Sequence, residues 1–489
     1  MKNGQVFVPG APFENKWYRI ESLVRRGLPG LQITGLPGAR EISRRLYLAL
    51  YALGLQNKAM ALNITPALRV RTADYLDLAF IAAICQAEFP DAPLLRMAGE
   101  KICFLGQVSL SGEISPPEEF LEKCLQCARL GVTSIIGPSP AREIRALFAN
   151  LDFIRVQRIQ DLLSVNHERI PWEASPGTGI SQLDTQPLSH LRLSPEVWRA
   201  AILALAGFHH LLLIGPPGTG KSSIARALRC LLPDPTERER QEILAIHGEK
   251  DSGARPVRMP HHSASLAGLI GGGNPPEMGE VTLAHNGLLI LDELAEFQGQ
   301  ALQALRETFD TRKVNISRAG HKMVFPARFL CIATTNPCPC GRKGSKERCL
   351  CTPARSLNYL RNIIGPLSDR IALEVRVQKS AVEEMLDTDR VRRELSTAWK
   401  RQRERFIKNS ITFNSDIPPE DMNFYCSIEH LKELPEIRAV TMNFQGSRKL
   451  IETRRLARTI ADLAGTAGIE KEHFLEAASF QCLSEYSSL

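Results

Sequence analysis

The sequence predicts an α/β protein in which a domain with a parallel sheet follows a smaller α+β domain and precedes a helical region. Residues 211–222 provide the first observation, because four apolar residues run into a glycine-rich turn that a helix-forming segment follows. Residues 288–293 provide the second, because another apolar stretch ends there in two acids. Before residue 165, strand-like stretches alternate with segments of helical spacing, as expected for mixed α/β folds.

The composition is that of an ordinary globular protein of two or three domains, with 489 residues, 44% of them hydrophobic and 23% charged. The net charge of +8 is compatible with nucleic-acid binding, but it is spread over a long chain. No apolar run has the length of a signal peptide core or a membrane span. We therefore expect a soluble cytoplasmic protein, in which the twelve cysteines bind metal or are buried rather than form disulfides.

The chain in order predicts four parts: a mixed α/β domain over 1–165, a linker over 166–190, the nucleotide domain over 191–380 and a mostly helical region over 381–489. Ser194 and Pro195 have the chemistry of a helix start, and an amphipathic helix is expected near the end of the chain. In the first part the patterns predict strands at 17–24, 31–35, 61–65 and 132–136, helices at 40–53, 76–87 and 118–130, and a hairpin over 104–114.

The stretch 211–222 carries the spacing G-x-x-x-x-G-K-S, which is typical of a phosphate-binding loop. Its glycines let several backbone N–H groups point at one phosphate, and the start of the following helix adds the positive end of its dipole. Lys221 is expected to reach the β- and γ-phosphates, and Ser222 to hold Mg²⁺. The predicted nucleotide contacts are Gly215, Pro216, Pro217, Gly218, Thr219, Gly220, Lys221, Ser222 and Ser223.

Asp292 and Glu293 follow the second apolar strand and predict the hydrolytic half of the same site. Asp292 is expected in the Mg²⁺ shell. Glu293 is expected to polarise the attacking water, because phosphoryl transfer needs a positioned nucleophile more than covalent help.

Four cysteines in two C-x-C pairs predict a structural zinc site. Four thiolates satisfy tetrahedral Zn²⁺ and leave no open position; the alternative is four free cysteines in a loop. The predicted ligands are Cys338, Cys340, Cys349 and Cys351. Cys124 and Cys127 also have metal-like spacing, but they lie on a predicted helix without a second pair, so we expect a buried face there.

Residues 313–325 alternate in polarity on both sides of a Gly-containing turn and predict a hairpin with a basic tip. Arg318 and Lys322 are the expected contacts to DNA phosphates, which would be salt-sensitive and independent of sequence. The alternative is a solvated basic turn.

Taken together, the nucleotide motifs resemble those of AAA+ ATPases. In that family an asparagine at the end of the strand over 330–336 orients the lytic water, and Asn336 matches it. The segment 365–371 is similar to the arginine-finger segment, which implies that Arg370 reaches the γ-phosphate of the neighbouring subunit; a salt bridge to Asp369 is the alternative. Arg448 matches the lid arginine called sensor two. A finger that acts in trans implies a hexameric ring.

The segments 27–37 and 106–113 resemble the amino-terminal domain of magnesium-chelatase-like ATPases of the ComM/YifB family, which shares the fold of the Lon proteolytic domain. The Lon serine–lysine dyad is absent: residues 70–77 hold no serine, and Leu121 stands at the lysine position. We therefore expect no protease activity. Lys123 is expected to be a solvated helix charge.

The same resemblance covers residues 259–265, whose paired histidines, His261 and His262, match a hallmark of the chelatase-like group. They precede no helix that would offer ligands at i and i+4. A role in a loop or an interface is therefore favoured over metal binding.

The resemblance implies a P-loop AAA+ domain with a parallel sheet, a helix-2 insertion, a hairpin and a helical lid, preceded by a Lon-protease-like domain of the ribosomal S5 domain 2-like kind. It implies an ATP- and Mg²⁺-dependent ring motor that moves along single-stranded or branched DNA, as in branch migration during natural transformation. One alternative is a chelatase-type ATPase that remodels a protein partner for metal insertion. Another is an ATP-switched scaffold with little turnover, which the presence of Glu293, Asn336 and Arg370 argues against.

Overall fold

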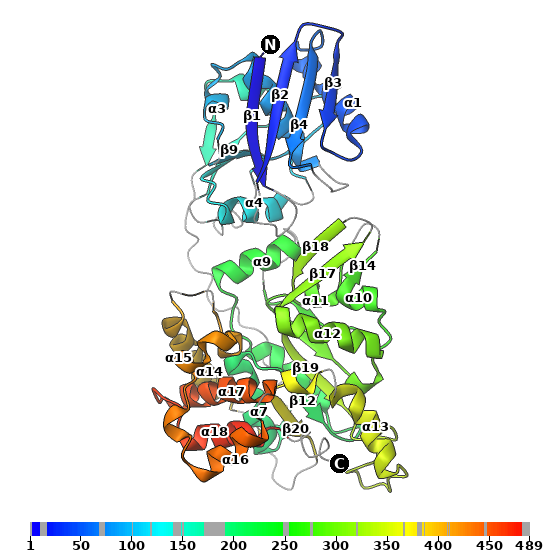
Figure 1. Cartoon of the computed structure of the whole chain (residues 1–489), viewed down its shortest axis with the longest axis vertical. Coiled ribbons are helices and arrows are strands. Elements are labelled where there is room, and N and C mark those ends of the chain that lie inside the picture. The colour runs from blue at the N-terminus through cyan, green and yellow to red at the C-terminus, as the bar shows by residue number, and fades with distance from the viewer. Residues whose placement is uncertain are drawn as a thin grey trace.

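The computed structural model describes residues 2–481 of the chain, apart from the segments 10–16, 68–73, 100, 118–119, 140–147, 149–150, 171–190, 248–253, 274–276, 319–320, 365–366, 379–383, 386, 408, 410 and 445–446. Figure 1 shows the N-terminal elements, in blue and cyan, at one end of the molecule and the other elements together at the opposite end. Within the described part of the chain, no helix combines the length and the apolar character needed to cross a membrane.

Two four-stranded sheets form the N-terminal part. The first has the order β1-β2-β4-β3, with β3 and β4 parallel and the other pairs antiparallel. Its strands are β1 (Lys2–Pro9), β2 (Trp17–Arg25), β3 (Gly30–Thr34) and β4 (Ala59–Thr65). The second has the order β10-β9-β8-β5, with strands β5 (Ile102–Phe104), β8 (Ser134–Gly137), β9 (Asp152–Arg155) and β10 (Glu168–Ile170).

Alternating buried and exposed residues along β2 bring one face of the first sheet against helix α2 (Asp77–Glu88), which is buried over nearly its whole length. The continuous apolar run of α2 therefore forms the centre of the N-terminal core. The other helices of this part are α1 (Ala39–Ala49), α3 (Pro93–Arg96) and α4 (Phe120–Arg129).

Two expectations for this part, for Lys123 and for the hairpin, are corrected. Lys123 is 1% exposed rather than solvated, and its Nζ lies 4.1 Å from the centre of the Tyr75 ring. Phe104 belongs to β5 in the second sheet, so the hairpin is confined to β6 (Gln107–Val108) and β7 (Ile114–Ser115). Strand β10 lies inside the start of the predicted linker and pairs with β9, while residues 171–190 lie outside the described residues.

A five-stranded, fully parallel sheet of order β13-β16-β19-β12-β20 forms the centre of the rest of the molecule. Successive residues of β12 alternate between two apolar clusters on opposite faces of the sheet, which is why the strand sequences are continuously apolar. The strands are β12 (Leu211–Ile214), β13 (Val257–Arg258), β16 (Leu288–Leu291), β19 (Leu330–Thr335) and β20 (Leu373–Arg376).

Helices cover both faces of this sheet. On one face lie α7 (Pro195–Gly207), α8 (Lys221–Ala227) and the C-terminal helices α14 (Thr388–Arg405), α17 (Arg448–Ala464) and α18 (Lys471–Ser479). On the other lie α10 (Leu266–Ile270), α11 (Glu280–Leu283), α12 (Gly299–Thr311) and α13 (Pro353–Ile364). Ser194 caps α7 through a bond from the Val197 amide, as predicted.

Three small antiparallel pairs complete the strands: β11 (Arg192–Leu193) with β21 (Glu384–Met385), β14 (Gly271–Gly272) with β15 (Glu277–Met278), and β17 (Lys313–Arg318) with β18 (His321–Pro326). The remaining C-terminal helices are α15 (Met422–Tyr425) and α16 (Pro435–Asn443).

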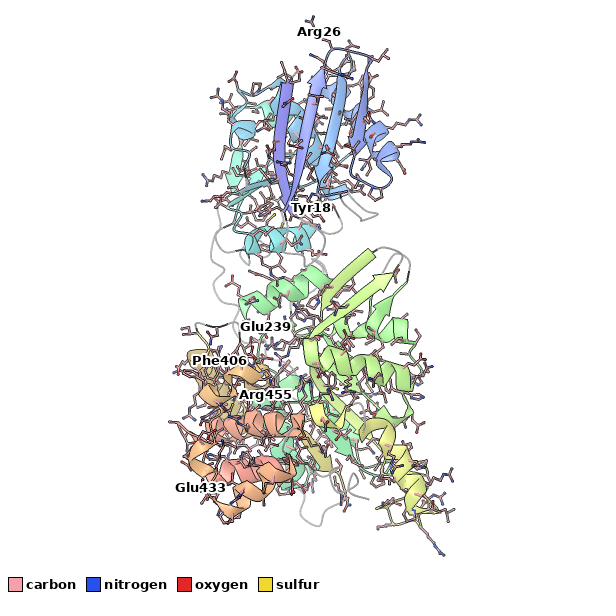
Figure 2. The ribbon with its side chains drawn as sticks, in the orientation of Figure 1. Tyr18, Arg26, Glu239, Phe406, Glu433 and Arg455 are labelled. Atoms are coloured by element: carbon pink, nitrogen blue, oxygen red, sulfur yellow. The ribbon has the colours of Figure 1, made fainter. Side chains whose placement is uncertain are left out.

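Helix α9 (Glu237–His247) joins the two ends of the molecule. It packs against α4, where Arg129 pairs with Glu242 at 2.5 Å and Leu244 enters the N-terminal core. Figure 2 places Glu239 of this helix between the N-terminal part and the C-terminal helices, whereas Arg26 lies at the outer end.

Glu239 has a buried side chain that accepts bonds from Arg255 at 2.9 Å and from Arg328 at 3.0 Å. Burial raises the pKa of this carboxyl, but the two arginines have the larger effect and lower the pKa from 4.5 to about 2. The folded protein therefore gains stability from Glu239 at neutral pH and loses it as pH falls from about 4.5 through about 2.

We predict that Glu239→Gln lowers the free energy of unfolding by about 3 kcal/mol at pH 7, because the buried Arg255 loses its counter-charge and Arg328 keeps only Asp416. Urea unfolding would measure it, with Glu237→Gln, an exposed acid on the same helix, as the neutral control. The difference in the free energy of unfolding between parent and Glu239→Gln should fall by about half from pH 6 to pH 3. If this difference in unfolding free energy did not change with pH, the ionised Glu239 carboxylate would not be its source.

Candidate nucleotide site and metal centre

The glycine-rich loop leaves β12 and enters α8 with the geometry that its sequence predicts. Gly218 and Gly220 have φ of +77° and +81°, a region that favours glycine. A Cβ on Gly215 would lie 2.3 Å from the carbonyl oxygen of Val377, so only glycine fits beside β20. Thr219 Oγ1 donates to the carbonyl of Pro216 at 2.9 Å and closes the loop.

Lys221 folds back over the loop. Its Nζ donates to the carbonyl oxygens of Gly215 at 2.7 Å and Pro216 at 2.9 Å, and to Oδ1 of Asn336 at 3.4 Å. Burial lowers the pKa of this ammonium, while Asp292 and Glu293 counteract the shift. The structure thus brings together Lys221 and Asn336, two predicted site residues that are far apart in the sequence.

Ser222 and Asp292 meet as expected for a shared metal ion, with Ser222 Oγ donating to Asp292 Oδ1 at 2.8 Å. A hydroxyl and a carboxylate side by side are hard oxygen ligands that suit Mg²⁺. Thr334 donates to the same Oδ1 at 2.5 Å and accepts a bond from the Glu293 amide at 3.2 Å. Sequence analysis missed Thr334, although it lies two residues before Asn336.

Glu293 has φ of 56° and ψ of 50°, a left-handed conformation that is uncommon for a residue with a side chain. Its side chain is 51% exposed, as access to a water molecule would require. His262 Nδ1 lies 3.5 Å from Glu293 Oε2, and its ring lies 4.1 Å from that of His261. The paired histidines thus belong to a loop at the edge of this site, in agreement with the favoured expectation.

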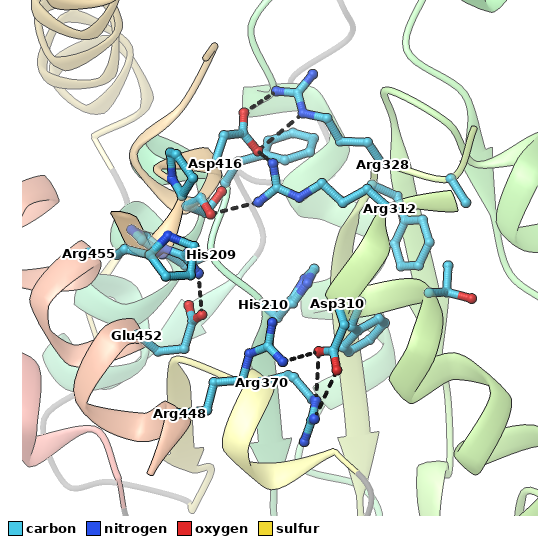
Figure 3. Close-up of a pocket in the computed structure, with 18 residues that line it drawn as sticks. His209, His210, Asp310, Arg312, Arg328, Arg370, Asp416, Arg448, Glu452 and Arg455 are labelled. Carbon is cyan, nitrogen blue, oxygen red and sulfur yellow. Dashed lines mark hydrogen bonds and ion pairs between the residues drawn. The ribbon is translucent and has the colours of Figure 1, made fainter. Parts of the chain in front are cut away.

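Arg370 and Arg448 lie elsewhere, at the edge of the sheet where the strands begin (Figure 3). They line a cavity of about 250 Å³ that also includes Asp310 of α12 and His210, the residue before β12. The loop at 215–222 follows the end of β12, so the two arginines and the phosphate-binding loop occupy opposite edges of the sheet.

Arg370 forms a two-point ion pair with Asp310, at 2.9 and 3.0 Å, and Asp369 is not its partner. The neighbours of Arg448 in the sequence have structural bonds of their own: Arg454 donates to the carbonyl of Cys426, and Arg455 pairs with Glu452. Arg448 and Arg455 both line the cavity, but Arg448 is the one that shares the carboxylate of Asp310 with Arg370.

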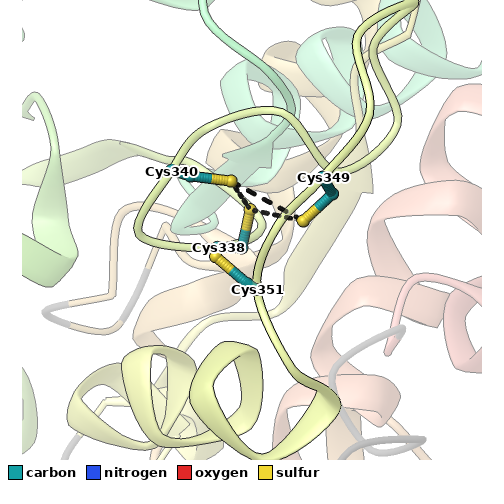
Figure 4. Close-up of side chains that lie close together, drawn as sticks. All are labelled: Cys338, Cys340, Cys349 and Cys351. Atoms are coloured by element: carbon teal, nitrogen blue, oxygen red, sulfur yellow. Dashed lines mark hydrogen bonds between the residues drawn. The ribbon is translucent and has the colours of Figure 1, made fainter.

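The four predicted zinc ligands come together in one loop (Figure 4). Sγ of Cys338 lies 3.5 Å from that of Cys340 and 3.7 Å from that of Cys349, and all four sulfurs lie within 4.8 Å of one another. Zn–S bonds of about 2.3 Å in a tetrahedron place sulfurs about 3.8 Å apart, so the cluster, completed by Cys351, fits zinc.

The pKa values of the cluster diverge. The backbone amide of Arg342 lowers the pKa of the Cys340 thiol to about 6, so this ligand is available as a thiolate at neutral pH. The hydrogen bond with Cys340 raises the pKa of Cys351; the Cys351 amide lowers the pKa of Cys349, but burial and the neighbouring thiols outweigh it and raise that pKa to about 11. The loop also touches the nucleotide site, because a Cβ on Gly341 would lie 3.0 Å from the ring of Pro217.

We predict that purified protein contains about one zinc per chain and that Cys338→Ser loses most of it, because three thiolates bind the ion less tightly than four. Metal analysis by mass spectrometry would measure the content. Cys482→Ser is the matched control, since it removes a thiol and keeps the cluster. Equal zinc in the parent and in Cys338→Ser would exclude the site.

The predicted hairpin is present as β17 and β18, which pair with Ser317 opposite Lys322 and Arg318 opposite His321. Strand β17 packs against α12 and β14. The side chains of Arg318 and Lys322 lie outside the described residues, so their contacts with DNA stay a prediction.

Comparisons with known proteins agree with the resemblance. Residues 188–385 match the family "Magnesium chelatase, subunit ChlI", residues 386–481 match its C-terminal part, and residues 20–140 match "Subunit ChlI of Mg-chelatase".

Relatives extend this similarity to nearly the full length. The chain is 30% identical to the uncharacterized protein YifB of Escherichia coli, over 95% of this chain and 94% of YifB. It is 29% identical to the competence protein ComM of Haemophilus influenzae, over 95% and 94% of the two chains. A putative lon protease homolog of Thermoplasma acidophilum is 38% identical over 15% of this chain and 14% of its own length. This chain therefore belongs to the magnesium-chelatase-like ComM/YifB family.

Proposed function

We propose that this protein is an ATP-hydrolysing ring motor of the AAA+ type that acts on DNA, with branch migration during recombination as its role. The observation that carries the proposal is the separation of Arg370 and Arg448 from the phosphate-binding loop of the same chain. Two arginines that face a cavity at the opposite edge of the sheet complete a nucleotide site only if a second copy docks there.

In the proposed mechanism, one subunit binds ATP through its glycine-rich loop, and Lys221 exchanges its carbonyl partners for the β- and γ-phosphates. Mg²⁺ between Ser222 and Asp292 would neutralise phosphate charge. Glu293 accepts a proton from the attacking water, and Asn336 orients that water. Arg370 and Arg448 of the adjacent subunit stabilise the charge on the γ-phosphate. The rate of hydrolysis therefore depends on the contact between subunits.

In the proposed motor, each part of the chain has a distinct role. Residues 1–165 are proposed as a Lon-protease-like domain of the S5 domain 2-like kind without a catalytic dyad, joined by a linker over 166–190. Residues 191–380 are the AAA+ core and residues 381–489 its helical lid. The hairpin β17–β18, beside α12, is the proposed DNA contact, with Arg318 and Lys322 at its tip. The relative named as a competence protein supports a role in natural transformation.

A second candidate is a chelatase-type ATPase that remodels a protein partner for metal insertion. The matches to magnesium chelatase subunits over most of the chain favour it. The two candidates share the ATP chemistry and differ in the partner that stimulates it.

We predict that single-stranded or branched DNA raises ATP turnover and that the double variant Arg318→Ala with Lys322→Ala loses most of this stimulation. Each lost phosphate contact should also reduce the slope of log affinity against log salt by about 0.7 for single strands. ATPase and DNA-binding assays at several salt concentrations would measure both effects. The control removes two exposed arginines of α14, Arg393 and Arg403, and should keep the stimulation. Turnover that is indifferent to every DNA would exclude the DNA motor and leave the ATPase intact.

A further inference from the structure

One carboxylate, that of Asp310, lies between the two arginines of the cavity. Its Oδ1 accepts from Arg370 Nε at 2.9 Å and lies 2.7 Å from Arg448 Nη1, while its Oδ2 accepts from Arg370 Nη2 at 3.0 Å. The three residues come from α12, from the turn Ser368–Arg370 before β20, and from the start of α17. Figure 3 shows the two guanidinium groups converging on this one side chain.

Asp310 is the one acidic partner of Arg370 and of Arg448 among the described residues. The other arginines of the cavity have acidic partners of their own, since Arg312 and Arg328 pair with Asp416 and Arg455 pairs with Glu452. Without Asp310, the two guanidinium groups would keep no acidic ion-pair partner among the described residues, and their mutual repulsion would disfavour the present arrangement.

The two arginines differ in how far their side chains are exposed to solvent. The side chain of Arg370 is 9% exposed, that of Asp310 25% and that of Arg448 33%. A two-point contact fixes the plane of the Arg370 guanidinium, and the single contact leaves Arg448 donors free at the surface. The group as a whole presents positive charge toward solvent in a fixed arrangement.

We propose that Asp310 is a positioning residue that holds Arg370 and Arg448 as a preformed pair for the γ-phosphate of the adjacent subunit's ATP. The inference rests on the proposed function, because it needs a nucleotide site shared between two copies. In this proposal Asp310 itself contacts neither ATP nor the attacking water. Its contribution is preorganisation: both donors are oriented before the phosphate arrives, so little reorganisation is needed in the transition state.

A purely structural role for Asp310, as a link between α12 and α17, makes a different prediction. Loss of a structural link lowers stability and assembly together with activity. Loss of a positioning residue lowers kcat, leaves ATP binding at the loop of the other subunit unchanged, and has no further effect once Arg370 and Arg448 are both removed.

The test uses the full-length protein and measures ATP turnover without DNA, together with binding of a fluorescent ATP analogue and the melting temperature. Asp310→Asn should lower kcat about tenfold or more, with KM within about twofold of the parent. The control is Glu307→Gln, an exposed acid of the same helix, which should be unchanged. Asp310→Glu should recover part of kcat. Adding Asp310→Asn to the double variant Arg370→Ala with Arg448→Ala should slow that double variant no further.

The results of these variants distinguish the role of Asp310 from the existence of a nucleotide site shared between subunits. If Arg370→Ala slows turnover and Asp310→Asn does not, or if Asp310→Asn slows the variant that already lacks both arginines, the role of Asp310 is wrong and the shared site stands. If Arg370→Ala itself has no effect, or the parent hydrolyses no ATP, the proposed function fails as well. A loss of melting temperature in both Asp310→Asn and Asp310→Glu that parallels the loss of kcat would assign Asp310 a structural role.

Discussion

The Arg370→Ala variant should hydrolyse ATP about a thousand-fold more slowly than the parent, because an arginine supplied in trans contributes that much to kcat in related phosphoryl transfers. ATP binding should be nearly unaffected, since Arg370 lies at the opposite edge of the sheet from the loop at 215–222. Steady-state turnover and binding of a fluorescent ATP analogue would measure the two effects separately. Arg306→Ala, an exposed arginine on α12, is the control and should keep full activity.

Mixing two inactive variants tests directly whether the nucleotide site is shared between subunits. Lys221→Ala alone should be inactive because it lacks the phosphate contact, yet it keeps an intact Arg370. When it is mixed with Arg370→Ala, some interfaces combine the intact loop of one variant with the intact arginine of the other. Turnover should therefore rise well above that of either variant by itself. Mixtures that stay as inactive as their components would contradict a shared site.

The parts of the candidate site whose proximity could be predicted from the sequence are short local motifs and the ends of parallel strands. The loop at 215–222 and the strands ending at Asp292 and Asn336 are local patterns, and parallel strands place their ends at one edge of the sheet. The cysteine cluster was equally predictable, because its two pairs lie in one short loop. The reach of Arg370 into a second subunit stays a prediction.

The parts that sequence analysis missed depend on contacts between distant segments. Asp310 lies 60 residues from Arg370, and nothing in the sequence marks it among the other acids of its helix. Thr334 bonds to Asp292 across two strands, and no motif contains both. Lys123 was expected in solvent because a lysine on a helix usually is; α9 and β1 cover its helix, which periodicity within one segment cannot reveal.

Exchange of Glu293 for glutamine should give the other large effect, a loss of turnover of about a thousand-fold with ATP still bound. An amide has nearly the shape of a carboxylate, so the left-handed backbone at this residue and its contact with Thr334 should persist. The amide accepts no proton at neutral pH, so the attacking water loses its general base, which contributes about a hundred- to ten-thousand-fold. Single-turnover phosphate release would measure the chemical step directly.

Comparison with Lys221→Ala separates binding from chemistry. Lys221→Ala should fail to retain ATP, whereas Glu293→Gln should hold it and remain assembled, because the contacts between the loop and the phosphates do not involve Glu293. Sedimentation with and without ATP would show this difference. Fast phosphate release from Glu293→Gln would mean that another group activates the water. His262, 3.5 Å from the Glu293 carboxylate, is the nearest candidate, and His262→Ala in that background would then test it, with His261→Ala as its matched control.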